Sequence, residues 1–521
     1  MNRTVLLAVA FGCAAASASA QPTVSGATEC AGLRNVQLPG FAISESTARW
    51  IPTGPAPAPG QFTPAPAVTL PAYCRVDAVL DRRTGVGGQQ YGIGFALALP
   101  EMWNGRLLFQ GGSGFNGQVG APIGAGPVGE MPALGKGFAV VSTDSGHRST
   151  NAFDTAFIVD QQASLDFAYR AVDRVTVVAK AIVAQHYRQP VARSYYTGCS
   201  TGGREAMQAA QRHPTEFDGV IVGAPAMRAN YAALGTDWVS VQLNQVAPRG
   251  ANGQPVTREA LSSTQKQAVI EGILNACDAN DGVQDRLVFN VTACKFDPKT
   301  LVCGGGNTGA GCLTAAQASA VERAFAGPRT SGGRQLYSPF PFDTGIADTQ
   351  GIPGLLHGAL IPAPASTTEI EAAARWADTD GPSALTNTAY WTNMTTFANR
   401  GGKMLFYHGV SDPTFSALDT IDYYGRLGQA NGGADAVREW SRLFLVPGMV
   451  HCAGGSMTTD AFDLLTALVD WVERGIAPDA VVATRRAAPQ LTRPLCAYPR
   501  YAHYTGKGDP QQAASFECRA P

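Results

Sequence analysis

SYYTGCSTGGREAMQAAQR, residues 194–212, places a predicted strand, a serine between small residues and a predicted helix in direct succession. The central Gly198-Cys199-Ser200-Thr201-Gly202 matches the G-x-S-x-G elbow, whose small residues permit a tight turn that lifts the serine hydroxyl clear of a sheet. A glycine-rich turn without chemistry is the alternative. The strand before the motif and the helix after it favour Ser200 as a nucleophile.

Strands and helices alternate on both sides of this motif. Strands are predicted at 107–109, 138–142, 219–222, 403–407 and 443–446, and helices at 164–187, 417–427 and 460–474. Such an alternation is typical of a parallel sheet covered by helices. Together with the elbow it predicts an α/β-hydrolase fold.

The alternation stops in the middle of the chain, where four cysteines and short helical pieces are mixed with Gly/Pro loops. We therefore predict a large lid domain at 226–396, inserted between the two halves, 21–225 and 397–521, of one catalytic domain.

The composition narrows the class of partners and the compartment. The 521 residues carry a formal net charge of −1, with 45% hydrophobic and 15% charged residues. This balance argues against nucleic acid or an anionic membrane as the main partner, and no apolar run can span a bilayer.

Residues 1–20 predict a cleaved signal peptide, because Arg3, an apolar stretch and Ala18-Ser19-Ala20 follow in the order of an export signal. The protein is therefore predicted to be exported to the periplasm or the medium.

A serine nucleophile needs a base that a third group orients. Among the seven histidines, His451 follows the strand 443–446 through a short turn, and Asp412 lies just past the strand 403–407. The order Ser200, Asp412, His451 is the order that the α/β-hydrolase fold requires. His147 is the main competitor for the base, and His408 lies close to Asp412 in the sequence.

Eleven cysteines less Cys13 of the signal segment leave ten, which predicts five disulfides in an oxidising compartment. Four pairs join near neighbours: Cys30–Cys74, Cys277–Cys294, Cys303–Cys312 and Cys496–Cys518. Cys199 and Cys452 remain, one next to Ser200 and one next to His451. If the serine and the histidine are hydrogen-bonded, these cysteines lie within the short separation that a disulfide needs.

The motifs around the three predicted catalytic residues, Gly-Cys-Ser-Thr-Gly-Gly, Gly-Val-Ser-Asp-Pro and Pro-Gly-Met-Val-His-Cys, resemble the Cys-Ser…Asp…His-Cys signature of the tannase/feruloyl esterase family. That family includes mono(2-hydroxyethyl) terephthalate hydrolases. The resemblance extends from Cys30 to Cys518 and implies an α/β-hydrolase core with an inserted lid, acting on esters of aromatic acids. It also implies an oxyanion hole made by the N–H groups of Gly112, in the glycine-rich segment 110–114, and Thr201.

Three carboxylates, Asp278, Asp281 and Asp285, stand close together in the predicted lid. Oxygen ligands at this density suit Ca²⁺, although a solvated turn is the alternative. The family resemblance implies a structural calcium site formed by the three aspartates and the backbone carbonyls of Val283 and Leu287.

These features predict an exported serine carboxylic-ester hydrolase that cleaves esters of phenolic or terephthalic-type acids through an acyl-enzyme. A lipase or peptidase on the same fold is one alternative, and a non-catalytic secreted binding protein is another. The candidates for an aromatic wall around a flat acyl group are Trp238, Trp376, Tyr390 and Trp391, although each such residue is more often part of a core. The candidates for binding a free acid are Arg228, Arg258, Arg323 and Arg375, and the sequence favours none of them.

Overall fold

The structure is a computed structural model that describes residues 26–60, 62–304, 309, 311–347 and 367–521. Its centre is a nine-stranded sheet with the strand order β1-β4-β5-β7-β6-β8-β9-β10-β11. Strands β7 to β11 in this order run parallel, and β1, β4 and β5 are antiparallel additions at one edge. A mainly parallel sheet with the elbow after a central strand confirms the predicted α/β-hydrolase fold.

The described strands are β1 (Ile43–Ile51), β2 (Gly54–Pro55), β3 (Thr69–Leu70), β4 (Tyr73–Thr84), β5 (Gln90–Pro100), β6 (Arg106–Gln110), β7 (Ala139–Thr143), β8 (Arg193–Cys199), β9 (Gly219–Gly223), β10 (Lys403–Gly409), β11 (Ser441–Val446), β12 (Ala480–Arg485), β13 (Ala488–Cys496), β14 (Tyr501–Tyr504) and β15 (Phe516–Arg519). The described α-helices are α1 (Ala27–Ala31), α2 (Gln161–Leu165), α3 (Ala171–Tyr187), α4 (Thr201–Arg212), α5 (Ala229–Asn244), α6 (Ser263–Cys277), α7 (Ala315–Phe325), α8 (Thr367–Thr379), α9 (Gly381–Thr386), α10 (Thr395–Asn399), α11 (Ala417–Ala430), α12 (Ala434–Arg438) and α13 (Leu464–Arg474).

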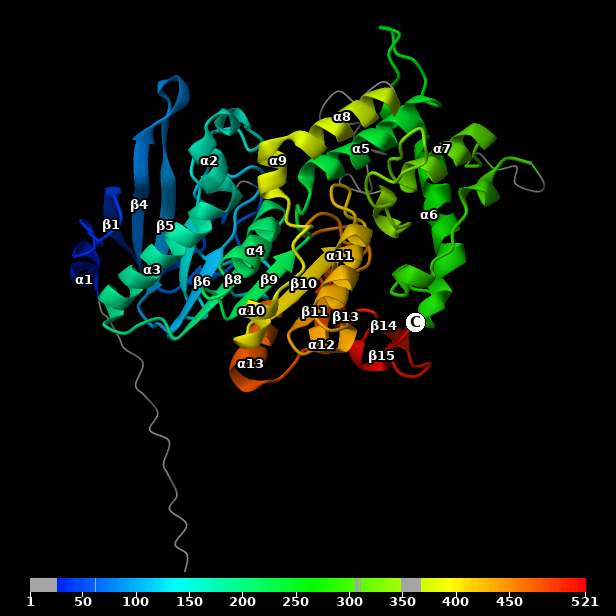
Figure 1. Cartoon of the computed structure of the whole chain (residues 1–521). Coiled ribbons are helices and arrows are strands. Elements are labelled where there is room, and N and C mark those ends of the chain that lie inside the picture. The colour runs from blue at the N-terminus through cyan, green and yellow to red at the C-terminus, as the bar shows by residue number, and fades with distance from the viewer. Residues whose placement is uncertain (1–25, 61, 305–308, 310, 348–366) are drawn as a thin grey trace, which may run out of the picture.

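Helices cover both faces of the sheet. Successive side chains of a strand point to opposite faces, so each strand packs against helices on both sides. In β6, Leu107 and Phe109 belong to the hydrophobic cluster formed with α3, α4 and α11, whereas Leu108 belongs to the cluster formed with α13. Figure 1 shows α3, α4 and α11 along one face of the strands. The parallel strands are therefore buried on both sides.

The strand order reverses at β6, because β7, the next strand in the chain, lies on one side of it and β8 lies on the other. In α/β sheets, ligands bind outside the carboxyl ends of the strands at such a point. The glycine-rich segment follows β6 and Ser200 follows β8, while Asp412 and His451 follow β10 and β11. The topology thus brings all the predicted catalytic segments to one edge of the sheet.

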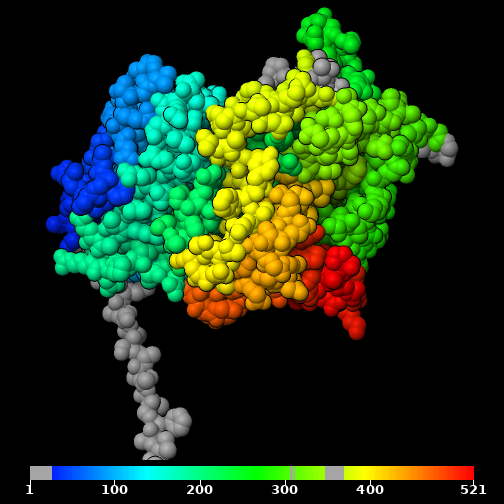
Figure 2. Space-filling model, viewed as in Figure 1, coloured from blue at the N-terminus to red at the C-terminus, as the bar shows by residue number. Residues whose placement is uncertain are grey.

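The segment between β9 and β10, residues 224–402, is called the insertion below. Its described residues contribute no strand to the main sheet, and α5, α6, α7 and α8 pack around a hydrophobic cluster of their own. Figure 1 places these helices to one side of the sheet, and Figure 2 shows the segment from α8 to α10 running from them across the catalytic core. The predicted lid limits, 226 and 396, fall inside this segment.

Five disulfides join the described cysteines in the predicted pairs: Cys30–Cys74, Cys199–Cys452, Cys277–Cys294, Cys303–Cys312 and Cys496–Cys518. None of the described helices is long and apolar enough to cross a membrane. The predicted signal peptide, residues 1–20, lies outside the described residues.

Candidate active site

Ser200 occupies a strained turn between β8 and α4. Its backbone angles, φ 64° and ψ −124°, lie in a region that non-glycine residues rarely adopt. Its N–H donates to the Gly223 carbonyl at 3.1 Å, and its own carbonyl accepts the Ala226 N–H at 3.0 Å. A Cβ on Gly202 would lie 2.6 Å from the Gly112 carbonyl oxygen, so this position requires glycine. The turn has the geometry of a nucleophile elbow.

Asp412 and His451 form a hydrogen-bonded pair beyond the ends of β10 and β11. His451 Nδ1 and Asp412 Oδ2 are 2.7 Å apart. Asp412 Oδ1 accepts the N–H groups of Thr414 and Phe415 at 2.8 and 3.0 Å. The Asp412 side chain is fully buried, whereas the imidazole is 24% exposed. The structure therefore orients the predicted base with the predicted acid and leaves part of the imidazole open.

His408 is a second imidazole next to Asp412. Its Nε2 lies 3.5 Å from Asp412 Oδ2 and 3.0 Å from the Phe415 carbonyl, and its Nδ1 lies 2.8 Å from the Thr420 hydroxyl. Burial raises the pKa of Asp412, but the charge of His451 and the hydrogen bonds from His408 and His451 outweigh it and hold that pKa well below its usual range. Both ring nitrogens of His408 are engaged, so it supports the acid and does not compete as the base.

The Cys199–Cys452 disulfide ties the elbow to the loop of His451, with a Cα–Cα distance of 5.9 Å. It joins the residue before Ser200 to the residue after His451, as predicted. Cys452 Sγ lies 3.6 Å from His451 Nε2. Within the described part of the chain no hydrogen bond joins Ser200 Oγ to this nitrogen, and such bonds often tighten only in the substrate complex.

The two predicted oxyanion donors have different surroundings. Thr201 is the first residue of α4, where N–H groups lack an intrahelical acceptor and the helix dipole favours negative charge. Its hydroxyl donates to the Gly114 carbonyl, which joins the glycine-rich segment to the elbow. The N–H of Gly112 instead donates to Glu205 Oε2 at 3.0 Å. In this arrangement Glu205 therefore binds the Gly112 N–H, and the role of Gly112 as an oxyanion donor stays a prediction.

Glu205 is a buried carboxylate beneath the glycine-rich segment. Besides the Gly112 N–H it accepts the Tyr196 hydroxyl at 3.0 Å, the Ser145 hydroxyl at 2.8 Å and the Asn116 side-chain amide. Its partners come from β8 and from the segments that follow β6 and β7. The sequence analysis did not single it out, although a glutamate five residues after the nucleophile, within the first turns of the predicted helix, was a usable signal.

His147, the main competitor for the base, is buried against aromatic rings. Its ring lies 3.8 Å from that of Phe157, centroid to centroid, and neither of its nitrogens has a hydrogen-bond partner among the described residues. Burial lowers the pKa of His147 to about 4. Without a carboxylate to orient it, this imidazole lacks the arrangement of a general base.

The eligible aromatic residues and arginines lie in different environments. Trp238 is buried in the insertion and donates its indole N–H to the Arg323 carbonyl at 2.8 Å. Trp376, Tyr390 and Trp391 are each more than half exposed. Arg228 pairs with Asp419 of α11, and the contacts of Arg323 stay within the insertion, as does the ion pair of Arg258 with Glu259. The side chain of Arg375 is exposed on α8.

The aspartate loop, residues 278–287, follows α6. Each predicted carboxylate ligand accepts a backbone N–H: Asp278 from Arg286 at 3.0 Å, Asp281 from Phe289 at 2.9 Å and Asp285 from Leu287 at 3.0 Å. The guanidinium of Arg493 also pairs with Asp285. No group of three or more His, Cys, Asp or Glu side chains in the described ranges is arranged to hold a metal ion.

The chemistry of the aspartate loop nevertheless suits a cation. Burial, followed by the charges of Asp285 and Asp278, raises the pKa of Asp281 to about 8. The carbonyl oxygens of Val283 and Leu287 accept no hydrogen bond from the described residues. Uncompensated carboxylates beside free carbonyls are the oxygen ligands that Ca²⁺ prefers.

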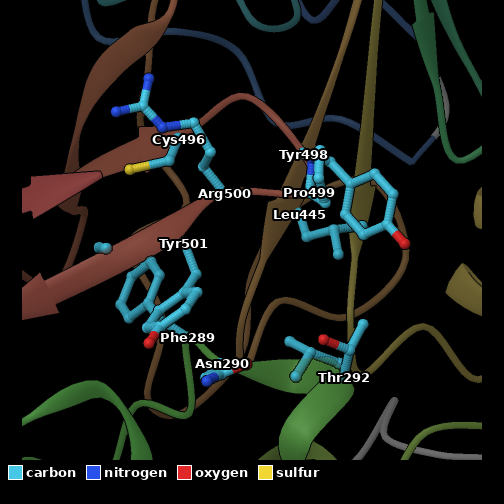
Figure 3. Close-up of a pocket in the computed structure, with 11 residues that line it drawn as sticks. Phe289, Asn290, Thr292, Leu445, Cys496, Tyr498, Pro499, Arg500 and Tyr501 are labelled. Atoms are coloured by element: carbon cyan, nitrogen blue, oxygen red, sulfur yellow. The ribbon is translucent and has the colours of Figure 1, made fainter. Parts of the chain in front are cut away.

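Two hollows are lined by residues of the catalytic domain, and the first also by residues of the insertion. Figure 3 shows the first, lined by residues 289–292, Leu445, Cys496 and residues 498–502. Its cavity volume of about 20 Å³ has room for a water molecule but not for an aromatic ester. The second, of about 570 Å³, is open to solvent and is lined by Gly117, Val119, Asp144, Arg148, Ser149, Thr150 and Asp154. Neither hollow includes Ser200, Asp412 or His451.

The chain is similar in sequence and in structure to known esterases. Residues 74–370 and 366–519 match the family described as Tannase and feruloyl esterase. The chain is 38% identical to a mono(2-hydroxyethyl) terephthalate hydrolase of Piscinibacter sakaiensis, over 93% of this chain and 89% of the relative. It is 31% identical to feruloyl esterase B of Aspergillus niger, over 81% of this chain and 82% of that enzyme. The crystal structure of feruloyl esterase B from Aspergillus oryzae superposes with a TM-score of 0.76 at 26% identity, covering 94% of this chain and 99% of that one.

Proposed function

This chain belongs to the tannase and feruloyl esterase family, and on that premise we propose that it hydrolyses carboxylic esters of aromatic acids through an acyl-enzyme on Ser200. The carrying observation is the 2.7 Å bond between His451 and Asp412, joined to the elbow by the Cys199–Cys452 disulfide. The names of the relatives, a terephthalate monoester hydrolase and feruloyl esterases, support an aromatic acyl group.

In the first half of the proposed reaction, Ser200 Oγ attacks the ester carbonyl carbon while His451 Nε2 takes the hydroxyl proton. The carbonyl oxygen becomes an oxyanion, which the free N–H of Thr201 at the start of α4 stabilises. The C–O bond to the alcohol then breaks, and His451 returns the proton to the departing oxygen. Asp412, held ionised by its low pKa, compensates the imidazolium that forms in between.

In the second half, a water molecule attacks the acyl-enzyme. His451 removes its proton, a second oxyanion forms and collapses, and Ser200 leaves with that proton as the free acid departs. Gly112 becomes a second oxyanion donor if its N–H turns away from Glu205. The insertion acts as the lid over the acyl group in this proposal, because it begins directly after β9, at the carboxyl edge of the sheet where Ser200, Asp412 and His451 follow their strands.

A rate comparison tests this function. Methyl ferulate, methyl gallate and mono(2-hydroxyethyl) terephthalate should each be compared with a long-chain p-nitrophenyl ester and with a peptide, for the native protein and for Ser200→Ala. We expect kcat/KM for at least one aromatic ester to exceed that for the long-chain ester and the peptide, and the variant to lose it. Faster cleavage of the long-chain ester would indicate a lipase, and faster cleavage of the peptide a peptidase. Binding of these esters without any turnover would indicate a binding protein.

Two further features belong to the proposal. We propose a structural Ca²⁺ held by Asp278, Asp281, Asp285 and the carbonyls of Val283 and Leu287, supported by the excess negative charge of the loop and by its free carbonyls. Chelation followed by a melting measurement tests it. We also propose export through the segment 1–20, supported by the five disulfides, which persist in oxidising compartments.

A further inference from the structure

Asp343 is a buried carboxylate of the insertion that reaches into the catalytic domain. It is 1% exposed and precedes the short helical turn Thr344–Ala347. One of its oxygens, Oδ2, accepts the Ser411 hydroxyl at 2.6 Å and the Gly448 N–H at 2.7 Å. The first partner is adjacent to Asp412, and the second lies in the turn that leads to His451.

We infer that Asp343 is a positioning residue: from the insertion, it fixes the position of the loop that carries Asp412 relative to the loop that carries His451. The inference rests on the proposed function, because it assigns Asp412 and His451 to catalysis. Asp343 itself contacts neither of them in the hydrogen bonds described, so its effect on the reaction passes through Ser411 and Gly448.

Direct hydrogen bonds also join the two loops, besides the one between Asp412 and His451. The Ser411 N–H donates to the Met449 carbonyl at 3.0 Å, and the Val410 N–H donates to the Val446 carbonyl at 3.0 Å. The Gly345 N–H donates to Ser411 Oγ at 2.9 Å, so the serine hydroxyl accepts from the insertion and donates to it. Asp343 thus adds a bridge that spans both loops at once.

The geometry of the Gly448 turn makes this bridge sensitive to position. Gly448 has φ +68°, and a Cβ there would lie 1.8 Å from the Met457 carbonyl oxygen, so the turn packs closely against residue 457 and requires glycine at this position. Hydrogen bonds to an ionised acceptor are stronger than those between neutral groups, and this one fixes the N–H side of the turn. Three residues later the chain reaches His451, whose ring must approach Ser200 within hydrogen-bond distance for proton transfer.

The test compares Asp343→Asn, Asp343→Ala and Ser411→Ala with the native protein. Asn can place its amide oxygen at the position of Oδ2 and keep both bonds, but an amide oxygen accepts less strongly than a carboxylate oxygen, whereas Ala removes the bridge. We expect kcat to fall about 10-fold in Asp343→Asn and about 100-fold in Asp343→Ala, because small displacements of reacting groups cost rate on this scale. KM should change less than about threefold. Ser411→Ala should resemble Asp343→Asn, because the bond to Gly448 survives.

The matched control is Asp378→Asn, which removes another insertion carboxylate. Its hydrogen bond to Tyr231 joins α8 to α5 inside the insertion, so it should lower the melting temperature without lowering kcat per folded molecule. A second readout is the rate at which a fluorophosphonate labels Ser200, measured per folded molecule. That rate should fall in parallel with kcat in the Asp343 variants and stay native in the control.

Native kcat and native labelling in folded Asp343→Asn and Ser411→Ala would overturn the inference. If Asp343→Ala does not fold, these two milder variants decide the question. Loss of kcat in Asp378→Asn equal to that in Asp343→Asn would also overturn it, because a general loss of insertion stability would then explain both. Failure of the proposed function is distinguishable, since the native protein would then show no turnover that Ser200→Ala removes.

Discussion

Two buried aspartates, Asp412 of the proposed triad and Asp281 of the aspartate loop, have opposite electrostatic surroundings. Each is 1% exposed, and burial by itself raises the pKa of both. At Asp412, two imidazoles reverse that effect and hold the pKa well below its usual range. At Asp281, two further carboxylates add to it, and the pKa rises to about 8.

The negative charge of Asp412 is balanced by other residues of the chain, whereas the negative charge of the aspartate loop is balanced, in our proposal, by a bound cation. Asp412 has His451 and His408 on one oxygen and two backbone N–H groups on the other. In the aspartate loop Arg493 pairs with Asp285, and no ion pair among the described residues reaches Asp278 or Asp281. Substitution in the first region should therefore affect the reaction, and substitution in the second should affect stability through a bound ion.

Asp412→Asn gives the largest effect that we expect. Asn retains the shape but loses the charge that stabilises the imidazolium and sets the tautomer of His451, so kcat should fall about 10⁴-fold with the fold intact. The matched change Asp281→Asn should reduce kcat per folded molecule far less. Steady-state kinetics normalised to the folded fraction by circular dichroism check both. Similar losses of kcat in the two variants would erase the contrast between the regions.

The positions of the segments proposed to be catalytic could be located in the sequence because each follows an apolar strand at a distance that the α/β-hydrolase order restricts. Ser200 carries a local motif, and Asp412 and His451 follow two late strands. The five disulfides were predictable from spacing, since four pairs are near neighbours and the fifth flanks the serine and the histidine. The N-terminal strand β4 escaped prediction because Arg75, Asp77 and Asp81 interrupt its apolar residues.

Contacts between distant segments were not predictable. The bond of Asp343 to Gly448 joins residues 105 positions apart, and that of Glu205 to Gly112 joins residues 93 apart. No local pattern marks such pairs, because only the packed fold brings them together. His408 was weighed as a base since it lies near Asp412 in sequence, whereas its buried contacts with Thr420 and Phe415 give it a supporting role.

Replacement of both Cys199 and Cys452 by Ala tests how far the triad region depends on its covalent tie. The bridge closes a loop of 253 residues, which the chain-entropy relation equates with about 5 kcal/mol, and measured losses are typically 2–5 kcal/mol. Activity per folded molecule should also fall. Denaturant unfolding and kinetics measure the two effects.

The double change of Cys303 and Cys312 to Ala is the control, since that bridge spans 9 residues of the insertion. It should cost about half as much free energy of unfolding and leave the activity of the folded protein native. Full activity in the folded Cys199/Cys452 variant would restrict that disulfide to a role in stability.

Calcium removal tests the other region. A ligand that binds only the folded state at about 100 times its Kd adds about 2.7 kcal/mol of stability, so chelation should lower the melting temperature by several degrees. The same chelator should have no effect on Asp281→Asn. Unchanged melting of the native protein, together with elemental analysis that finds no calcium, would show that the charge of the loop is balanced in another way.

Glu205→Gln is expected to have a smaller effect. Its amide nitrogen cannot accept a hydrogen bond, so one of the donors now bound by Glu205 loses its acceptor and the glycine-rich segment loosens. We expect kcat to fall about 10-fold, measured on the best aromatic ester. A rise in kcat would instead indicate that Glu205 competes with the oxyanion for the N–H of Gly112.

The most direct test of the central claim is the identity of the residue that carries the acyl group during turnover. The protein is mixed with an aromatic p-nitrophenyl ester, quenched in acid within the first turnovers and mapped by mass spectrometry after proteolysis. The account predicts the mass of the acyl group on the peptide that contains Ser200, and its absence in Ser200→Ala. Turnover with the acyl group on another residue, or with no covalent species while the native rate persists, would contradict it.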